Sequence, residues 1–321
     1  MPGRSTRGTI LEDRPSACTT DASPTRPVLR YHGGKWRAAP WILSHFPAHR
    51  VYAEPYGGAA SLLFQKPRVY AEIYNDLDAE IVNVFRVLRD PRTSADLERL
   101  IRLTPFARDE FEAAYEPCGE SVEQARRTVL KAFAGHGSDS IHRGSAAHAG
   151  MLTRPSRWNP GTGFRSDSTS GTTAAKGWAH YPEQISRFCS RLAGVVIEHR
   201  PALRVIEQYD YADTLFYVDP PYVRSSRRDA THGYRHEMTD DQHRELAAVL
   251  RSIRGMAIVS GYACHLYDKE LYPDWRRAEL AVRTLGDGHG AVEVLWMSPK
   301  VRAREPSLFD ATGDDANWEG S

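Results

Sequence analysis

Cysteine is scarce in this sequence, and long hydrophobic runs are missing altogether. The cysteines at positions 18, 118, 189 and 264 lie far apart and form no Cys-x-x-Cys pair, so the sequence predicts neither a zinc site nor a disulfide framework. No window approaches the roughly 18 uninterrupted apolar residues that a membrane span needs. The N-terminus also lacks the basic and apolar segments of a secretory signal. We therefore expect a cytoplasmic protein that makes no use of a membrane.

Several motifs of metal and nucleotide binding are missing too. The pairs His45/His49 and His232/His236 have helical spacing but no His-Glu-x-x-His context, so no metal is expected. Without a Gly-x-Gly-x-x-Gly or a Walker lysine, a dinucleotide or a nucleoside triphosphate is an unsuitable ligand. The net charge of +1 gives no general attraction to a polyanion. Most of the positive charge is arginine, which suits phosphates and guanine edges, although GC-rich codon usage produces the same bias.

What the sequence does contain is an alternation of strand and helix patterns. With 321 residues, 41% hydrophobic and 26% charged, the chain is long enough for one large globular domain with an insertion, or for two modest domains. The alternation predicts an α/β fold, an open and mostly parallel sheet with helices on both faces. Flexible, polar tails are expected at 1–26 and 306–321. Strands are predicted at 50–54, 69–74, 194–198, 214–218, 256–260, 276–284 and 291–297, and helices at 36–46, 59–65, 78–89, 183–193 and 240–253.

The alternation breaks between residues 92 and 180. Three helical stretches, 94–103, 107–116 and 122–134, lead into 135–177, a long segment rich in Gly, Ser, Thr and Arg. Such a segment is uncommon inside a compact domain unless it is functional or disordered before binding. It is either a plain flexible insertion or a nucleic-acid contact region that orders on binding, and we favour the second interpretation. The candidate DNA contacts are Arg143, Arg154, Arg157, Arg165 and Lys176, with Trp158, Phe164 and Trp178 interleaved and only Asp139 and Asp167 opposing them.

The most informative motif is Asp219-Pro220-Pro221-Tyr222, which follows the apolar run 214–218. A buried strand that stops at this motif places a carboxylate at its C-terminal edge. The two prolines stiffen the backbone and remove two N–H donors, so their carbonyls remain as acceptors. A carboxylate, a carbonyl and a flat ring together suit a planar group that carries an amine. A rigid turn that only closes the strand is the simpler alternative.

Polar residues also follow three other predicted strands, as Glu54-Pro55-Tyr56-Gly57-Gly58, Asn75-Asp76 and Ser260-Gly261-Tyr262. The carboxyl ends of parallel strands meet at one edge of a sheet, where open α/β folds bind their ligands. Gly57 and Gly58 are expected to let the backbone approach a ligand and to aim N–H groups at it. Asp76 stands at the spacing where an acidic side chain binds a ribose diol. These residues therefore predict one composite site.

An upstream turn, Tyr31-His32-Gly33-Gly34-Lys35, adds a cation suited to a ligand carboxylate, although alone it would be interpreted as a surface turn with a solvated lysine. The combination favours a nucleoside with little or no phosphate, and S-adenosylmethionine fits that description. The candidate cofactor-binding residues are Tyr31, Gly34, Lys35, Glu54, Pro55, Tyr56, Gly57, Gly58, Asp76 and Asp219.

Taken together, the motifs resemble the Dam-type site-specific DNA adenine-N-6 methyltransferases, and most of all their phage and prophage branch. The resemblance implies a Rossmann-like S-adenosylmethionine-dependent methyltransferase sheet with a C-terminal hairpin over 27–91 and 181–305. It also implies a mainly helical target-recognition insertion over 92–180. One departure is Ala60, which stands where the family's cofactor motif has its last glycine. The resemblance spans 28–300 and rests on Tyr31-x-Gly-Gly-Lys35, Glu54-Pro-Tyr-Gly-Gly58, Asn75-Asp-Leu-Asp78, Thr104-Pro-Phe-Ala-Arg-Asp-Glu-Phe111, Asp219-Pro-Pro-Tyr222, Ser260-Gly-Tyr262 and Glu293-Val-Leu-Trp296.

The resemblance implies methyl transfer from S-adenosylmethionine to the N-6 amine of a flipped adenine in duplex DNA. The catalytic residues would be Asp219, Pro220, Pro221 and Tyr222. The Asp219 carboxylate and the Pro220 carbonyl would accept the amine hydrogens, and Tyr222 would stack on the base. Duplex DNA is the expected partner, a restriction endonuclease is a candidate second partner, and the enzyme is expected to act as a monomer without a metal.

Other activities are compatible with the same residues. The same chemistry could act on cytosine N-4, an RNA base or a protein glutamine. Asp219 favours adenine, since glutamine methyltransferases usually carry Asn-Pro-Pro-Tyr and cytosine-amine enzymes often Ser-Pro-Pro-Tyr. A non-catalytic DNA-binding remnant of a prophage methylase and another nucleoside-binding α/β enzyme are the remaining alternatives.

Overall fold

A seven-stranded sheet forms the centre of the computed structural model, which describes residues 23–31, 33–135, 141, 163–165, 173–227, 234–283 and 290–301. The strand order is β3-β2-β1-β4-β5-β7-β6. The first five strands in this order are parallel, whereas β7 runs antiparallel to both β5 and β6. The order reverses between β1 and β4, which makes that point the topological switch of the sheet. The strands are β1 (Val51–Glu54), β2 (Ala71–Asn75), β3 (Val196–Glu198), β4 (Thr214–Val218), β5 (Met256–Tyr262), β6 (Arg276–Arg283) and β7 (Gly290–Met297).

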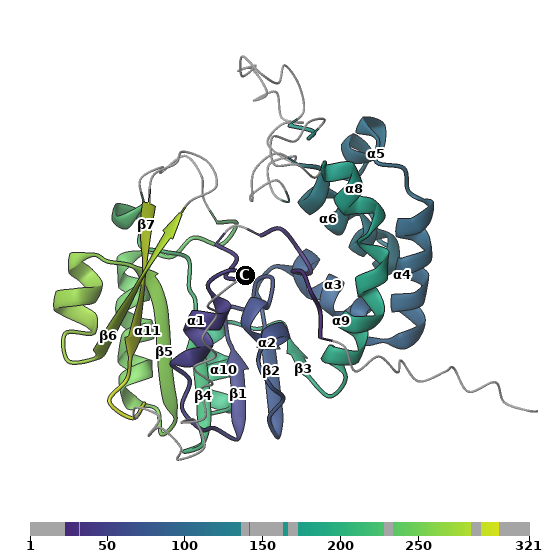
Figure 1. Cartoon of the computed structure of the whole chain (residues 1–321). Coiled ribbons are helices and arrows are strands. Elements are labelled where there is room, and N and C mark those ends of the chain that lie inside the picture. The colour runs from purple at the N-terminus through teal and green to yellow at the C-terminus, as the bar shows by residue number, and fades with distance from the viewer. Residues whose placement is uncertain are drawn as a thin grey trace, which may run out of the picture.

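Helices cover both faces of the sheet, and β4 shows why. Every residue of β4 is buried, and its side chains alternate between two hydrophobic clusters. Leu215 and Tyr217 belong to the cluster that includes α1 (Ala39–Ser44), α2 (Ser61–Gln65) and α3 (Ala79–Arg89). Phe216 and Val218 belong to the cluster that includes α10 (Ala202–Gln208) and α11 (Asp240–Ser252). A strand buried on both faces reads as a continuous apolar run, so the predicted α/β fold is confirmed (Figure 1).

A group of helices stands beyond the β3 edge of the sheet, opposite the β6–β7 hairpin (Figure 1). It contains α4 (Pro91–Leu103), α5 (Arg108–Ala113), α6 (Ser121–Ala134) and α8 (Ala174–Ala179), and α9 (Ile185–Leu192) packs against both α3 and α4. Asp90 caps α4 by accepting from two backbone N–H groups, and Pro91 follows at the first helical position. Buried residues of α3, α4, α6 and α9 share one cluster with the sheet, so a common core fixes these helices in place.

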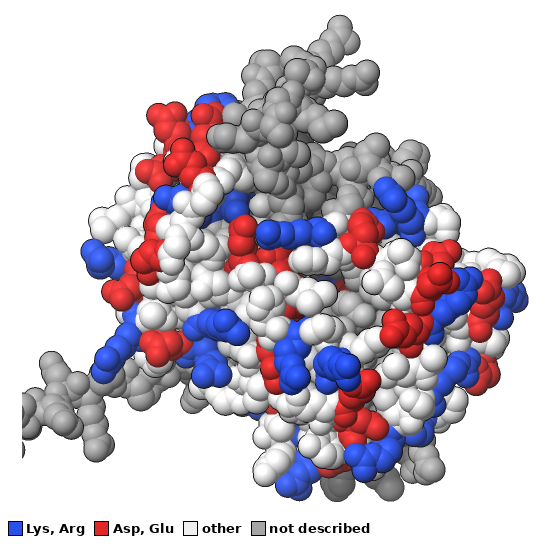
Figure 2. Space-filling view, turned by 180° about the vertical axis from the view of Figure 1, so that it is seen from behind, with Lys and Arg blue, Asp and Glu red and all other residues white. Residues whose placement is uncertain are grey.

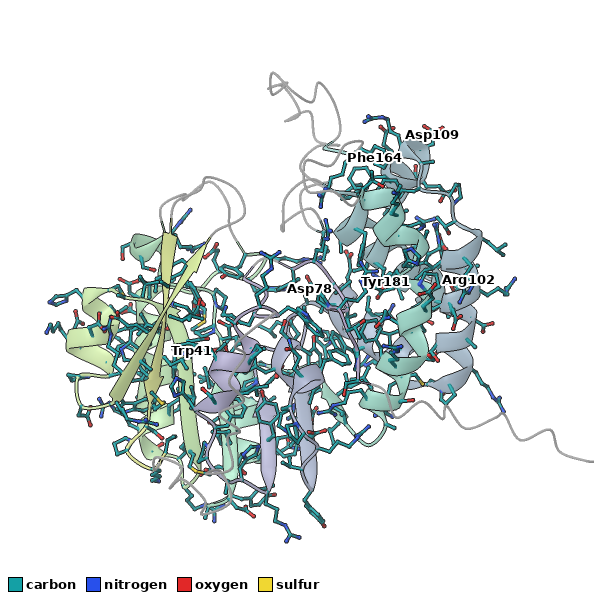
Figure 3. The ribbon with its side chains drawn as sticks, in the orientation of Figure 1. Trp41, Asp78, Arg102, Asp109, Phe164 and Tyr181 are labelled. Atoms are coloured by element: carbon teal, nitrogen blue, oxygen red, sulfur yellow. The ribbon has the colours of Figure 1, made fainter. Side chains whose placement is uncertain are left out.

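The helices predicted at 94–103, 107–116 and 122–134 correspond to α4, α5 and α6. The prediction that 135–177 lacks structure is wrong at two places. Helix α8 begins at Ala174. The ring of Phe164 packs among the helices, with its centroid 5.1 Å from that of Phe106 and 5.7 Å from that of Phe111 (Figure 3). Helix α10 was not predicted, because it has seven residues and no side-chain cap.

The N-terminal tail predicted over 1–26 extends too far into the chain. Thr25 donates from its backbone N–H to Gln184, and the Arg26 guanidinium donates to the Gly177 carbonyl, so both residues pack against the helices. Residues 1–22 and 302–321 lie outside the described part of the chain. The division into 27–91 with 181–305 and an insertion over 92–180 stays a prediction, since α9 packs against helices from both.

The surface seen from behind carries Lys and Arg side chains close beside Asp and Glu (Figure 2). No extended area of one charge appears among the residues described on that face, so they form no continuous basic surface of the kind that binds a polyanion. Within the described ranges, no helix is both long and apolar enough to cross a membrane.

Candidate active site

A cavity of about 340 Å³ opens at the switch point of the sheet. The carboxyl ends of β1, β2 and β4 form one wall, and Tyr31, residues 33–35, 201–203 and 234–238 are among the others that line it. Four of the five segments that the sequence singled out therefore line the cavity, and the fifth, 260–262, contacts Asp219 and Tyr222. The predicted residues on the cavity wall are Tyr31, Gly34, Lys35, Glu54, Pro55, Tyr56, Gly57, Gly58, Asp76, Asp219 and Pro221.

The glycine turn after β1 packs tightly against the end of β2. A Cβ at Gly57 would lie 2.2 Å from a ring carbon of Tyr74, so only glycine fits there. The N–H of Gly57 donates to the Asn75 carbonyl at 2.7 Å, and that of Gly58 donates to the Asp76 carboxylate at 2.8 Å. The expectation that these N–H groups point at a ligand is therefore not met, because both are used inside the protein.

Ala60, the N-cap residue just before α2, has a left-handed backbone, φ +50° and ψ +40°. A non-glycine residue in this region costs about 1 kcal/mol, because its Cβ crowds the following carbonyl. The departure noted from the sequence thus has a structural counterpart. Alanine occupies a position whose conformation glycine would adopt without strain, and the surrounding fold holds it there.

Two carboxylates lie at the ends of β1 and β2. Asp76 accepts from the Gly58 N–H with one oxygen and from the Asp78 N–H with the other, both at 2.8 Å. Burial raises the pKa of Asp76, although these bonds act in the opposite direction. Glu54 is 2% exposed and accepts from the Tyr52 hydroxyl at 2.6 Å and from the Leu63 N–H at 2.8 Å. Burial raises the pKa of Glu54 to about 7.

Asp219 lies at the end of β4 with both carboxylate oxygens held. The Ser260 hydroxyl donates to Oδ1 at 2.8 Å, and the Lys35 ammonium contacts Oδ2 at 2.9 Å. Lys35 also donates to the Gly33 carbonyl at 2.7 Å. Burial disfavours the charged amine, but the negative charges of Asp219 and Glu293 outweigh this and raise the pKa of Lys35. The sequence predicts Lys35 as the partner of a ligand carboxylate, whereas in the structure it is the counter-ion of the Asp219 carboxylate.

Tyr222 lies behind the cavity wall and is 5% exposed. Its hydroxyl donates to Glu293 at 2.5 Å, and its ring meets Tyr262 edge-on at 4.7 Å between centroids. The Lys35 nitrogen lies 4.8 Å from the ring centroid. Pro220 is buried and Pro221 half-buried. The motif is therefore compact, with its ring packed inside the protein.

Two parts of the site escaped the sequence analysis. Glu293 entered it only within a motif of the resemblance, although a charged residue inside the apolar run 292–297 was a usable signal. Residues 234–238, the rim segment, carry no recognisable pattern. Arg235 ties this segment to α3 by contacting Asp78 at 3.0 Å and Glu80 at 3.5 Å. Asp78 lies between the sheet and the helices (Figure 3), and Glu80 also pairs with Lys131 of α6 at 2.6 Å.

The candidate DNA-contacting residues are mostly beyond what the structure describes. Arg143, Arg154, Arg157 and Trp158 lie outside the described residues. Lys176 is exposed on α8, and Arg165 is half-buried, its N–H donating to Ala134. Phe164 and Trp178, which the sequence shows interleaved with these basic residues, are buried. They are 7% and 4% exposed and pack inside the helical group, where the Trp178 indole donates to Thr104.

The switch-point cavity, with Asp-Pro-Pro-Tyr at the end of the central strand, defines a Rossmann-like methyltransferase. The model of the D12 class N6 adenine-specific DNA methyltransferase family matches residues 31–115 and 165–278. The chain belongs to this family, and it is an enzyme that methylates the N-6 amine of adenine in DNA. None of the curated proteins matches the chain. Across the part of the chain that the structure describes, no three His, Cys, Asp or Glu side chains gather as metal ligands.

Proposed function

We propose that the switch-point cavity holds S-adenosylmethionine and that Asp219 presents the target amine to it. The observation that carries this assignment is that one cavity is lined both by Asp76 and the β1 turn and by Asp219. In open α/β sheets this edge is the ligand site. The decisive experiment is methyl transfer from tritium-labelled S-adenosylmethionine to DNA, RNA and protein, where label should appear in DNA alone, as N6-methyladenine.

The chemistry of the wall fits this cofactor. A volume of about 340 Å³ lies within the range of small-ligand sites. Each Asp76 oxygen accepts one bond and retains a second lone pair for a sugar hydroxyl. Glu54, Asp76 and Asp219 make the wall acidic, which favours a ligand that carries a sulfonium and an ammonium. Arg235 also pairs with Asp78 and Glu80, but its side chain is 45% exposed at the rim, so it is a better candidate for the ligand carboxylate than the buried Lys35, which Asp219 engages.

The residues of the chain account for the rest of the reaction. The bound cofactor supplies a methyl group on a positively charged sulfur. The adenine amine is a poor nucleophile because its lone pair is delocalised into the ring. Acceptance of its hydrogens by the Asp219 carboxylate and the Pro220 carbonyl localises that pair. The base must leave the duplex to reach these two acceptors, and stacking on Tyr222 requires in addition that its ring, which is 5% exposed, be uncovered.

The cofactor assignment predicts a specific loss in the variant Asp76→Ala. Affinity for S-adenosylmethionine should fall by about tenfold or more, since a hydrogen bond to a charged group contributes about 1.5–3 kcal/mol. Isothermal calorimetry gives the affinity, and circular dichroism checks the fold. Asp213→Ala is a suitable control, because Asp213 is exposed at the opposite end of the sheet. Unchanged affinity would move the ribose contact to another residue.

We further propose that 92–180 is the target-recognition region and that its basic segment contacts DNA. The family match is interrupted between residues 115 and 165, as expected for a segment that differs between enzymes of different sequence preference. Exposed Lys176 adds a cation on the described side of that gap. Action as a monomer in the cytoplasm, alone or beside a restriction endonuclease, belongs to the same hypothesis.

Replacing Arg154, Arg157 and Arg165 together by alanine tests this region. Each lost phosphate contact should lower the slope of log affinity against log salt by about one unit. Fluorescence anisotropy with a labelled duplex measures that slope, and Arg204→Ala, an exposed change on α10, is the control. If both salt dependence and site preference are unaltered, recognition lies in α4–α6 or in the rim segment instead.

A further inference from the structure

Glu293 is a buried acid in an otherwise apolar strand. It lies in β7 opposite Tyr262 of β5 and Leu280 of β6. The next four residues of the strand are uncharged and at most 1% exposed. Glu293 itself is 5% exposed. A carboxylate in such a place costs several kcal/mol unless its charge is compensated. It also lies outside the residues that match the family model, so no role comes to it from there.

The partners of Glu293 belong to the catalytic motif or contact it. The Tyr222 hydroxyl donates to Glu293 Oε1 at 2.5 Å, and the Lys35 ammonium lies 3.8 Å from the same oxygen. Lys35 in turn contacts Asp219 at 2.9 Å. Glu293 therefore reaches both ends of Asp219-Pro220-Pro221-Tyr222, the last residue directly and the first through one ammonium.

These contacts constrain the orientation of Tyr222. The hydroxyl oxygen of a tyrosine lies on the axis of its second side-chain torsion, so tethering it fixes the direction of the side chain, and packing against the ring sets the plane. Tyr262 supports the ring from its edge. Without the Glu293 carboxylate, the phenol would lose its acceptor in a buried place, and the side chain would no longer be held in this direction.

The charges constrain Asp219 as well. Two carboxylates flank one ammonium, with Lys35 closer to Asp219 than to Glu293. A lone lysine would fully neutralise Asp219 and weaken it as an acceptor for the amine. The Glu293 carboxylate also attracts the Lys35 ammonium, so the ammonium neutralises Asp219 less completely. When the target amine binds Asp219, the ammonium has Glu293 as an alternative partner. Burial raises the pKa of Glu293 and Lys35 opposes this, and with both carboxylates ionised the cluster keeps a net negative charge where positive charge develops on the amine, which favours the transition state.

We propose that Glu293 is a positioning residue for methyl transfer, which fixes the ring of Tyr222 and shares the Lys35 ammonium with Asp219. The proposal rests on the roles of Asp219 and Tyr222 proposed above. It assigns the C-terminal hairpin a part in catalysis, not only in closing the sheet.

The test compares Glu293→Ala and Glu293→Gln in single-turnover methyl transfer to duplex DNA. Glu293→Ala should lower the rate by about 100-fold, as a displacement of about 1 Å in a reacting group does. Glu293→Gln keeps an acceptor for Tyr222 but not the charge, so it should recover part of that loss. Affinity for S-adenosylmethionine should stay within about twofold, because Glu293 itself does not line the cavity. Glu279→Ala is the control, an exposed glutamate in the same hairpin, which pairs with Arg277.

A double-mutant cycle with Tyr222→Phe separates positioning from simple loss of stability. If Glu293 acts through the phenol, adding Tyr222→Phe to Glu293→Ala should lower the rate little further. A Glu293→Ala rate equal to that of the Glu279→Ala control overturns the proposal. So does a pattern in which Ala and Gln lose rate, cofactor affinity and thermal stability together. The wild-type enzyme and Asp219→Ala are measured in the same assay, so failure of the catalytic assignment is recognised separately.

Discussion

Asp219→Ala should lower the rate of methyl transfer by about 100- to 1000-fold, the effect of removing one charge-assisted acceptor from a transition state. The structure makes this variant informative, because Lys35 keeps Glu293 as a counter-ion when Asp219 is gone. The buried ammonium is then not left unpaired, and the fold should persist. Single-turnover transfer of tritium to duplex DNA measures the rate, and gel shift shows that DNA is still bound.

Two comparisons sharpen the Asp219 experiment. Asp219→Asn keeps the shape of the side chain but replaces one acceptor oxygen by a donor, so it should lose most of the activity too. Asp213→Ala changes an exposed carboxylate just before the same strand and should retain full activity. Near-normal turnover of Asp219→Ala would sink the catalytic assignment.

Glu72→Ala is expected to have the largest effect on stability, a loss of about 3–5 kcal/mol. Glu72 is 3% exposed on β2 and accepts from Lys66 at 2.7 Å and from Arg191 at 2.6 Å and 2.9 Å. Its removal leaves two buried cations without their carboxylate. Urea unfolding followed by circular dichroism gives the free energy of unfolding.

The exposed pair of Glu98 and Arg102 provides the matched control. Their side chains are 30% and 51% exposed, so Glu98→Ala should cost less than about 0.5 kcal/mol. Acidification adds a second readout. Burial opposes the charge of Glu72, but hydrogen bonds from Arg191 and Lys66 prevail and lower its pKa. Its contribution is therefore present above the ordinary glutamate range and is lost as the pH falls below it. Equal losses in the two variants would mean that the buried network adds no stability.

The sequence predicted the sheet well because its strands are buried on both faces and therefore read as apolar runs. Strand β4 was predicted at its observed bounds, and the residues after β1, β2 and β4 were predicted to meet because parallel strands share a carboxyl edge. Helix α8 was not predicted, because the surrounding Gly, Ser and Thr residues make its helical pattern difficult to recognise. Its buried face consists of Ala174 and Trp178 alone. The partners of Lys35 could not be predicted, because they depend on side chains from three distant segments that meet only after folding.

The position of β7 has a consequence for how the enzyme is made. This strand is the later of the two in the hairpin, yet it lies between β5 and β6, so β6 leaves the ribosome before the strand that joins it to the sheet. Contacts between segments so distant along the chain form slowly. The ion pair of Lys35 with Glu293 joins the first described turn to this last strand. On the proposed role of Glu293, a nascent chain that has not yet reached β7 lacks part of the catalytic centre, so methyl transfer should be slow until synthesis has passed the hairpin.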